Sequence, residues 1–406
     1  MASVADIRAE EDGRPIRGLW GKIATRWAQA ATHGDLTLLL PSGSRRTFRG
    51  KEPGPSATLA VNRMRVVRRM MTRGDVGFAE AFMDGDWTTP DLQALLAFGY
   101  ANETALSGPM TASPVIAPLI RLWHRLRANT RAGSRRNIAY HYDLGNAFYA
   151  LWLDPTMTYS SAVFDDPSWS LEEAQTEKYR RIIRSLDLKP TDHVLEIGCG
   201  WGGFAELAAA ETGCRVTCIT LSREQAAFAR ERMARAGVSD RVEIRIQDYR
   251  DVPETYDKIV SIEMFEAVGE ENWPVYFNAV RDRLKPGGRA VLQIITVADD
   301  RFETYRGAVD FIQRYIFPGG MLPSKAILSR EVATAGLTLS GTSFFGLSYA
   351  ETLARWYDDF RARWPDVAAL GFDERFRRMW AYYLCGCEAS FRSGACDVGQ
   401  YVIDRP

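Results

Sequence analysis

Several features that would place the chain in a common class of protein are missing from the sequence. No run of 18 or more apolar residues occurs among its 406 residues, so no segment predicts a membrane-spanning helix. The first 18 residues hold acidic side chains and no apolar stretch, which argues against a secretory signal. We therefore expect a cytoplasmic protein, peripherally associated with the inner face of the membrane.

Cysteine is scarce, and no pair of Cys-x-x-Cys units exists, so the sequence predicts no structural zinc site and no other metal centre. Disulfides are not expected in the cytosol. Hydrophobic residues make up 46% of the chain and charged residues 25%, which is typical of a folded protein with a core. The length favours two domains. The six cysteines are Cys199, Cys214, Cys218, Cys385, Cys387 and Cys396.

The formal net charge is zero, but the charges are unevenly distributed. Residues 1–136 hold 20 Lys and Arg against 12 Asp and Glu, whereas the remainder holds 31 against 39. A basic N-terminal part suits an anionic partner, either a lipid surface or a nucleic acid. A solvated helix face of no special function would give the same composition.

The N-terminal third predicts a smaller, mainly helical domain over residues 1–130. Residues 19–40 indicate a helix and then a short strand, and residues 75–99 another helix, with Asp91 after Pro90 as a candidate N-cap. Residues 104–118, with three prolines, indicate a connector. Arginines alternate with Leu and Trp over 119–136, which suits either a helix lying on a membrane or an ordinary linker.

From about residue 190 short apolar strands alternate with helices, and we expect a second domain spanning residues 131–406. This alternation predicts an α/β fold with a parallel sheet covered on both faces, Rossmann-like in class. Such sheets bind ligands at the C-terminal ends of their strands. The expected strands are His193–Ile197, Arg215–Thr220, Val242–Ile246, Lys258–Ile262 and Arg289–Ile295, and the expected helices run to Ala210, over Arg223–Ala236 and over Asn272–Leu284.

A glycine-rich turn follows the first of these strands. Gly198, Gly200 and Gly203 would let the backbone approach a ligand closely and turn into a helix. Glu196 precedes the first glycine, at the place where methyltransferases carry an acid for the amino-acid end of S-adenosylmethionine. The turn therefore indicates that cofactor rather than a dinucleotide.

The next two strand ends support the same choice. The second strand ends without the acidic residue with which NAD enzymes bind ribose, so we expect Thr220 and Gln225 to contact the ribose instead. Asp248 ends the third strand, at a suitable place to bind the adenine.

Several long motifs resemble those of the cyclopropane fatty acid synthases, a family of fatty acyl C-methyltransferases. The resemblance covers residues 135–360 closely and the N-terminal region more loosely. The motifs, in chain order, are Tyr140–Asn146, Leu153–Pro155, Met157–Ser161, Glu196–Gly203, Met264–Gly269 and Tyr315–Gly320.

The resemblance implies that S-adenosylmethionine methylates a double bond inside a phospholipid acyl chain. The alkene would attack the sulfonium methyl group, and a bound bicarbonate would then remove a proton from the resulting cation. Positioning in a dry pocket would supply much of the rate, because an alkene is a poor nucleophile. The family also implies a homodimer and a membrane phospholipid as partner.

The resemblance maps the bicarbonate site onto four side chains and the backbone of Ile295. Glu266 and Tyr349 match the family residues, whereas Ser161 stands in place of a cysteine and Gln293 in place of a histidine. Serine and glutamine can still bind an anion, but neither titrates near neutral pH as histidine does. Two further residues, Tyr159 and Ser160, would lie over the carboxylate end of the cofactor.

The two replacements bear on the product. Loss of a proton from the added methyl group permits closure to a cyclopropane, whereas loss from a chain carbon leaves a methylated alkene. Because Ser161 and Gln293 alter the proton-accepting site, we favour a methyl-branched or methylene product, with a cyclopropane as the alternative. A small-molecule or RNA methyltransferase, and a lipid-binding protein without activity, also stay open, although no recognised nucleic-acid-binding module is present.

Overall fold

The computed structural model describes residues 19–110 and 144–406, and these divide into two compact units. Of these described residues, 19–110, 308–312 and 368–393 form the first unit, and the others form the second. The predicted boundary near residue 130, like the basic segment 119–136, lies outside the described residues. The expected division at one point of the chain needs correction, because residues 368–393 return to the first unit.

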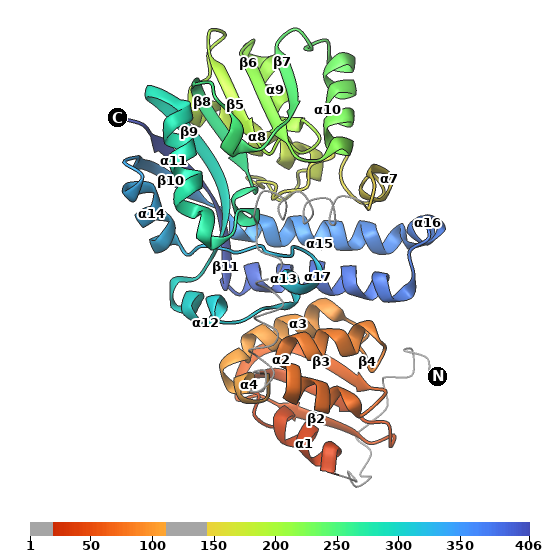
Figure 1. The fold of residues 1–406 in the computed structure, drawn as a ribbon. Coiled ribbons are helices and arrows are strands. Elements are labelled where there is room, and N and C mark those ends of the chain that lie inside the picture. The colour runs from red at the N-terminus through yellow and green to blue at the C-terminus, as the bar shows by residue number, and fades with distance from the viewer. Residues whose placement is uncertain (1–18, 111–143) are drawn as a thin grey trace. The chain divides into compact units, whose positions relative to one another are not determined.

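The first unit is built on a four-stranded sheet of order β2-β1-β3-β4, in which β1 and β3 are parallel. The expected mainly helical domain therefore contains a sheet as well (Figure 1). Helix α3 packs on β3, and α17 packs against α2 and α3. The elements are α1 (Leu19–Ala28), β1 (His33–Leu39), β2 (Arg45–Arg49), β3 (Glu52–Val61), α2 (Arg65–Met83), β4 (Trp87–Thr88), α3 (Leu92–Ala101), α4 (Glu103–Met110) and α17 (Glu374–Arg392).

The helix and strand expected within residues 19–40 are confirmed as α1 and β1. The single helix expected over 75–99 is wrong, because β4 separates α2 from α3. Trp87 of β4 is fully buried, stacks on Phe78 and donates its indole N–H to the Phe78 carbonyl at 2.9 Å. Asp91 is confirmed as an N-cap, since its carboxylate accepts from the Ala94 N–H at 2.9 Å at the start of α3.

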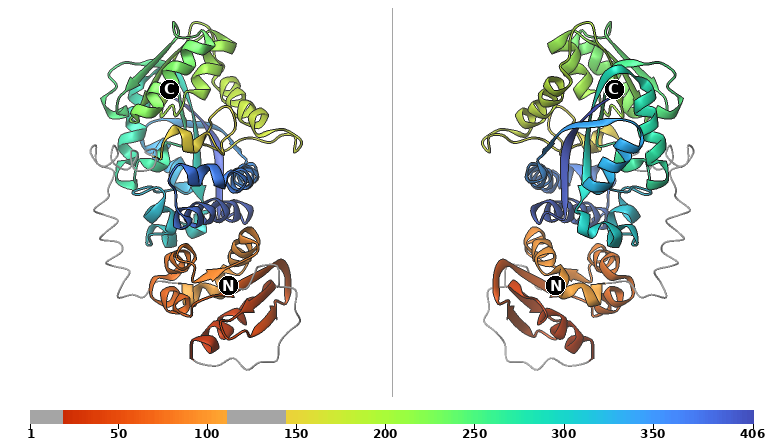
Figure 2. Two further views of the ribbon diagram at one scale, coloured as in Figure 1. Left: turned by 90° about the vertical axis from the view of Figure 1, so that its right-hand side faces the viewer. Right: turned by 90° about the vertical axis from the view of Figure 1, so that its left-hand side faces the viewer.

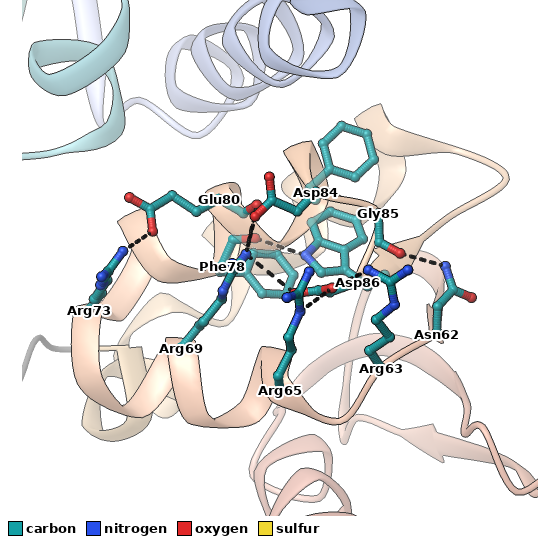
Figure 3. Close-up of polar contacts among 12 residues, drawn as sticks. Asn62, Arg63, Arg65, Arg69, Arg73, Phe78, Glu80, Asp84, Gly85 and Asp86 are labelled. Carbon is teal, nitrogen blue, oxygen red and sulfur yellow. Dashed lines mark hydrogen bonds and ion pairs between the residues drawn. The ribbon is translucent and has the colours of Figure 1, made fainter. Parts of the chain in front are cut away.

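An arginine cluster surrounds the buried carboxylate of Asp86 just before β4 (Figure 3). The Arg65 Nε lies 2.7 Å from the Asp86 carboxylate, and Arg63 and Arg69 approach it within 3.5 and 3.3 Å. Three guanidinium groups therefore share one buried carboxylate, which fixes the start of α2 against the turn that precedes β4.

The second unit contains a seven-stranded sheet of order β10-β11-β9-β8-β5-β6-β7. Strands β5 to β9 are parallel, and β11 and β10 extend the sheet with antiparallel pairing. Its strands are β5 (His193–Ile197), β6 (Arg215–Thr220), β7 (Val242–Ile246), β8 (Tyr256–Ile262), β9 (Leu284–Val297), β10 (Thr338–Phe344) and β11 (Cys396–Asp404). The doubly wound α/β arrangement and its five parallel strands are thus confirmed.

Helices cover both faces of this sheet, as the two views of Figure 2 show. Alternate residues of one strand enter different cores: Val194 packs with α8, α9 and α10, whereas Leu195 packs with α11 and α14. The helices are α7 (Asn146–Tyr149), α8 (Leu171–Leu186), α9 (Gly203–Thr212), α10 (Arg223–Ala236), α11 (Trp273–Arg283), α12 (Phe302–Arg306), α13 (Phe311–Tyr315), α14 (Lys325–Thr334), α15 (Gly346–Ala362) and α16 (Trp364–Ala369).

The order of the strands places a ligand site. The chain runs from β5 outward to β6 and β7, then returns to β8 on the other side of β5. Parallel sheets bind ligands at such a reversal, at the C-terminal ends of the strands. None of the helices in the described ranges is long and apolar enough to cross a membrane.

Candidate active site

A cavity lies at the C-terminal ends of β5, β6, β7 and β8, where the reversal predicts it. All eight residues expected to contact the cofactor line this cavity: Tyr159, Ser160, Glu196, Gly198, Gly200, Thr220, Gln225 and Asp248. Trp201, Tyr249, Glu263 and Met264 contribute further walls. Segments far apart in the sequence therefore form one site.

The glycine turn after β5 forms the cavity floor because its backbone adopts conformations that other residues disfavour. Gly198 and Gly200 have φ angles of 83° and 51°. A Cβ atom on Gly198 would lie 2.7 Å from the Met264 side chain, whereas one on Gly200 would meet no atom within 4 Å. The turn thus leaves open space beside the backbone N–H groups that lead into α9.

Glu196 is a buried acid at the end of β5, with only 3% of its surface exposed. The Cys218 thiol donates to its carboxylate at 3.3 Å. Burial raises the pKa of Glu196 to about 8. A carboxyl group in these surroundings gains from a cationic ligand, so Glu196 is suited to bind the ammonium of an amino acid.

Thr220 at the end of β6, Gln225 in the first turn of α10 and Asp248 after β7 form another part of the site. The Thr220 hydroxyl donates to the Gln225 side-chain oxygen at 2.9 Å, which fixes both groups at the cavity wall. Asp248 binds Arg250 through two hydrogen bonds of 2.8 and 2.6 Å. Asp248 therefore lines the cavity with its carboxylate engaged by Arg250, and its contact with adenine stays a prediction.

Tyr159 and Ser160 approach the cavity from the segment before α8. Tyr159 packs against Tyr149 and Trp356, with ring centroids 5.4 and 5.3 Å away. The Ser160 hydroxyl accepts a hydrogen bond from the buried Lys178 ammonium at 2.6 Å. The aromatic wall and the buried amine therefore meet at this side of the cavity.

The most connected group of the site is Glu263, which sequence reasoning missed. It follows β8 directly and lines the cavity. Its carboxylate accepts three hydrogen bonds, from the Ser161 backbone N–H at 2.8 Å, the Gln293 side-chain amide at 2.8 Å and the Tyr349 hydroxyl at 2.7 Å. Burial raises the pKa of Glu263, while these donors and the Lys178 charge oppose the rise.

The backbone of Glu263 is itself unusual, with φ at 51° in the left-handed region that side chains other than glycine avoid. The backbone N–H donates to the Gln293 carbonyl at 2.8 Å, which holds this conformation. The signal in the sequence was a charged residue directly after an apolar strand, at the edge of the sheet where ligands bind.

Glu266 lies one turn further along and forms a second, separate contact. One of its carboxylate oxygens accepts from the Ile295 backbone N–H at 2.6 Å, and the other is buried without a hydrogen-bond partner among the described residues. Burial, with the negative charge of Glu263, raises the pKa of Glu266 to about 8. Two neighbouring carboxyl groups with raised pKa values can hold or release a proton at neutral pH.

The residues expected to bind bicarbonate have other partners in this structure. Ser161, Gln293 and Tyr349 do converge, but the carboxylate that they bind belongs to Glu263. The Ser161 hydroxyl donates to the Ala162 carbonyl at 2.8 Å, so only its backbone takes part. A side-chain carboxylate therefore uses the donors assigned to a bound anion.

Comparisons with known proteins show what the chain is similar to. The sequence pattern of a family described as mycolic acid cyclopropane synthetase matches residues 129–401. A tuberculostearic acid methyltransferase of Mycobacterium tuberculosis is 40% identical over 96% of this chain and 93% of its own. A cyclopropane-fatty-acyl-phospholipid synthase of Escherichia coli is 36% identical over 83% of this chain and 85% of its own.

Solved structures of other proteins match the fold of this chain. A mycolic acid cyclopropane synthase complexed with SAH and CTAB aligns with a TM-score of 0.63 at 32% identity, covering 66% of this chain and 98% of its own. A coclaurine N-methyltransferase aligns with a TM-score of 0.63 at 19% identity, covering 82% and 99%, which supports the fold alone.

The raised pKa of Glu266 predicts a pH-dependent stability. A glutamate whose pKa is higher folded than unfolded destabilises the folded state as pH rises from its ordinary value, near 4.5, toward 8. Glu266→Gln removes this charge, so the difference in Tm between variant and wild type should grow by at least about 2 °C between pH 5 and pH 8.5. Thermal unfolding at both pH values measures this, and a constant difference would contradict it.

Proposed function

The chain belongs to the mycolic acid cyclopropane synthetase family, and from this premise we propose that it methylates a double-bond carbon in unsaturated phospholipid acyl chains. The chain is an S-adenosylmethionine-dependent C-methyltransferase, and the product we propose is a methyl-branched or methylene-modified acyl chain. The observation that carries this proposal is the Glu263 carboxylate, held by three donors at the wall of the cofactor cavity.

The cavity suits the cofactor on the chemistry of its walls. Glu196 offers a carboxylate for the ammonium of the amino-acid end, and the turn at Gly198 and Gly200 leaves the backbone accessible. Thr220 and Gln225 line the cavity with a hydroxyl and an amide, groups that can hydrogen-bond the hydroxyls of a ribose. When bound, S-adenosylmethionine supplies an electrophilic methyl group.

The proposed reaction needs a base that removes a proton from the methylated acyl chain. Addition of a methyl group to a double bond leaves a positive charge on the neighbouring chain carbon, and a proton must leave before the product is neutral. Glu263 supplies a fixed carboxylate for that proton and stabilises the cation while it exists. Tyr349, Gln293 and the Ser161 N–H hold the carboxylate in position without taking the proton themselves.

A base fixed to the chain also bears on the choice of product. Glu263 cannot move with the substrate as a bound anion can, so it accepts a proton from one place only. The 40% identity over 96% of the chain is to a relative named as a methyltransferase, and the 36% identity over 83% is to one named as a cyclopropane synthase. The higher identity and coverage to the relative named as a methyltransferase support a branched or methylene product over a ring.

The first unit is proposed to bring the protein to an anionic membrane surface. We define the α2 arginine face as Arg65, Arg68, Arg69 and Arg73, spaced along successive turns of α2. In Figure 3, four arginines are paired with three carboxylates. The arginines are Arg63, Arg65, Arg69 and Arg73, and the carboxylates are those of Glu80, Asp84 and Asp86. The exposed Arg68 adds a further cation. The same unit exposes Leu19, Trp20 and Met71, which suits insertion between phospholipid headgroups. A homodimer stays a prediction.

The proposed product is tested by mass spectrometry of lipids from a bacterial host without cyclopropane lipids, expressing this chain and fed methionine with a trideuterated methyl group. We expect labelled acyl chains that are one carbon heavier, with the ring absent. Three retained deuterium atoms indicate a methyl branch, and two indicate a methylene group, which hydrogenation separates from a cyclopropane. Labelled cyclopropane chains alone would disprove the preferred product, and unlabelled chains would disprove acyl methylation.

The role of Glu263 predicts a specific loss on substitution. Glu263→Gln keeps the side-chain volume but removes the base, so methyl transfer should fall by about 10²- to 10⁴-fold while affinity for S-adenosylhomocysteine stays within about twofold. In Glu263→Gly, added bicarbonate should restore part of the activity, whereas the wild type should be indifferent to it. Near-normal activity of Glu263→Gln, or a wild type that needs bicarbonate, would argue against a built-in base.

The α2 arginine face is tested by flotation with vesicles of neutral or anionic phospholipid. Arg68→Glu should weaken binding to anionic vesicles at least about fivefold, since each basic residue near such a surface contributes about 1 kcal/mol. The control Arg235→Glu makes the same charge change on an exposed residue of α10 in the second unit and should bind like the wild type. Equal binding of the wild type to both kinds of vesicle would reject the electrostatic part.

A further inference from the structure

Lys178 of α8 places an ammonium group in the interior of the second unit. The side chain is completely buried. Its ammonium donates to the Ser160 hydroxyl at 2.6 Å and lies 4.3 Å from the centre of the Tyr179 ring. Burying a cation is costly unless nearby charges or polar groups compensate, so this position requires an explanation.

The charges around Lys178 are carboxylates that belong to the cofactor cavity or its border. Burial lowers the pKa of Lys178, and Glu263, Asp154 and Glu196 oppose the fall. Glu196 and Glu263 line the cavity, as does Ser160, the direct partner of the ammonium. Lys178 therefore lies directly behind the wall at this end of the site.

The walls of the cavity have little positive charge of their own. Arg250 is the one Lys or Arg among the described residues that line it, and both carboxylate oxygens of Asp248 engage its guanidinium group. A ligand that carries a carboxylate therefore meets no uncompensated cationic side chain in the wall. Two cations outside the wall act on Glu196, the partly exposed Arg232 and the fully buried Lys178. Of these, the Lys178 ammonium donates to a hydroxyl group of the cavity wall.

The amino-acid end of S-adenosylmethionine carries an ammonium and a carboxylate on one carbon atom. Glu196 provides the charge that complements the ammonium. The Ser160 oxygen accepts from Lys178, which leaves the hydroxyl hydrogen available for a second partner on the cavity side. A hydroxyl that accepts from a cation is also a stronger donor, because the two hydrogen bonds polarise one another.

We propose that Lys178 is a positioning residue for the cofactor, which transmits its positive charge through the Ser160 hydroxyl to the cofactor carboxylate. Lys178 itself does not touch the ligand. The pair Glu196 and Lys178–Ser160 then recognises the zwitterion as a whole, and the inner end of the cavity distinguishes the intact cofactor from nucleosides without the amino-acid end.

The affinities for two ligands distinguish a positioning role of Lys178 from a purely structural role. S-adenosylhomocysteine keeps the amino-acid end without the reactive methyl group, whereas 5′-methylthioadenosine keeps the nucleoside and sulfur without the carboxylate and ammonium. Isothermal titration of the full chain should show that Lys178→Met lowers affinity for S-adenosylhomocysteine about tenfold or more. Affinity for 5′-methylthioadenosine should change less than twofold, which also reports that the cavity is intact.

The path through Ser160 is tested by a double-mutant cycle. Ser160→Ala alone should lower affinity for S-adenosylhomocysteine, and Lys178→Met added to it should lower affinity by less than a further twofold. The control Lys189→Met removes an amine that is 63% exposed, just after α8, and should bind both ligands like the wild type. Should Lys178→Met fail to fold, the ligand preference of Ser160→Ala decides the proposal.

Several outcomes would overturn the proposal. One is that Lys178→Met binds S-adenosylhomocysteine as tightly as the wild type does. Another is that Lys178→Met loses affinity equally for both ligands. A third is that the losses of affinity in Lys178→Met and Ser160→Ala add in the double variant. If Lys178→Met does not fold, the proposal is overturned when Ser160→Ala keeps the wild-type ratio of affinities for S-adenosylhomocysteine and 5′-methylthioadenosine. A wild type that binds neither ligand would instead refute the assignment of the cofactor. Failure of this inference can therefore be told from failure of the proposed function.

Discussion

The site depends on the carboxylate of Glu263 and on the three donors that hold it. Ser161 precedes α8, Gln293 lies in β9, and Tyr349 lies in the first turn of the long helix α15. No two of these segments adjoin in sequence, so one charged group fixes their relative positions at the end of the sheet. The left-handed backbone of Glu263 is strained, and the three hydrogen bonds to its carboxylate offset the cost of that strain.

The surroundings of Glu263 show how the site holds charge in its interior. Glu196 and Glu266 have pKa values raised to about 8, and the buried Lys178 lies within reach of the charges of Glu196 and Glu263. Such groups weaken the folded state, since each loses hydration on burial. They suit a site that binds a cationic cofactor and handles a proton, where fixed charges need no rearrangement during the reaction. The stability of the rest of the unit comes from the two cores on either face of the sheet.

In the first unit, several arginine side chains are held close together. Its buried Asp86 orders three guanidinium groups at the beginning of α2, so a cluster of like charges becomes a fixed surface rather than a set of independent side chains. Part of the excess of basic residues in the first third of the chain thus lies on the α2 arginine face. The return of α17 from the end of the chain to this unit shows that the two units are not separate in sequence.

Local sequence was enough for the parallel strands and the glycine turn, because each depends on a strand end or a turn that nearby residues specify. It also selected eight residues that line one cavity, and their contacts with the cofactor stay a prediction. It was also enough for Asp91 as a helix cap. The motif resemblance selected Ser161, Gln293 and Tyr349 as neighbours, which the structure bears out in their shared partner. Composition alone suggested the basic N-terminal part, but neither its sheet nor the place of α17.

Only the tertiary structure decided which group these three residues bind. A glutamate after an apolar strand has no local feature that predicts a left-handed backbone, and its role arises when β9 and α15 bring Gln293 and Tyr349 to it. The same is true of Lys178, which in sequence is one of several basic residues on α8 and becomes a buried charge only through packing. Sequence thus determined which residues reach the end of the sheet, whereas burial and long-range contacts determined their charge and their partners.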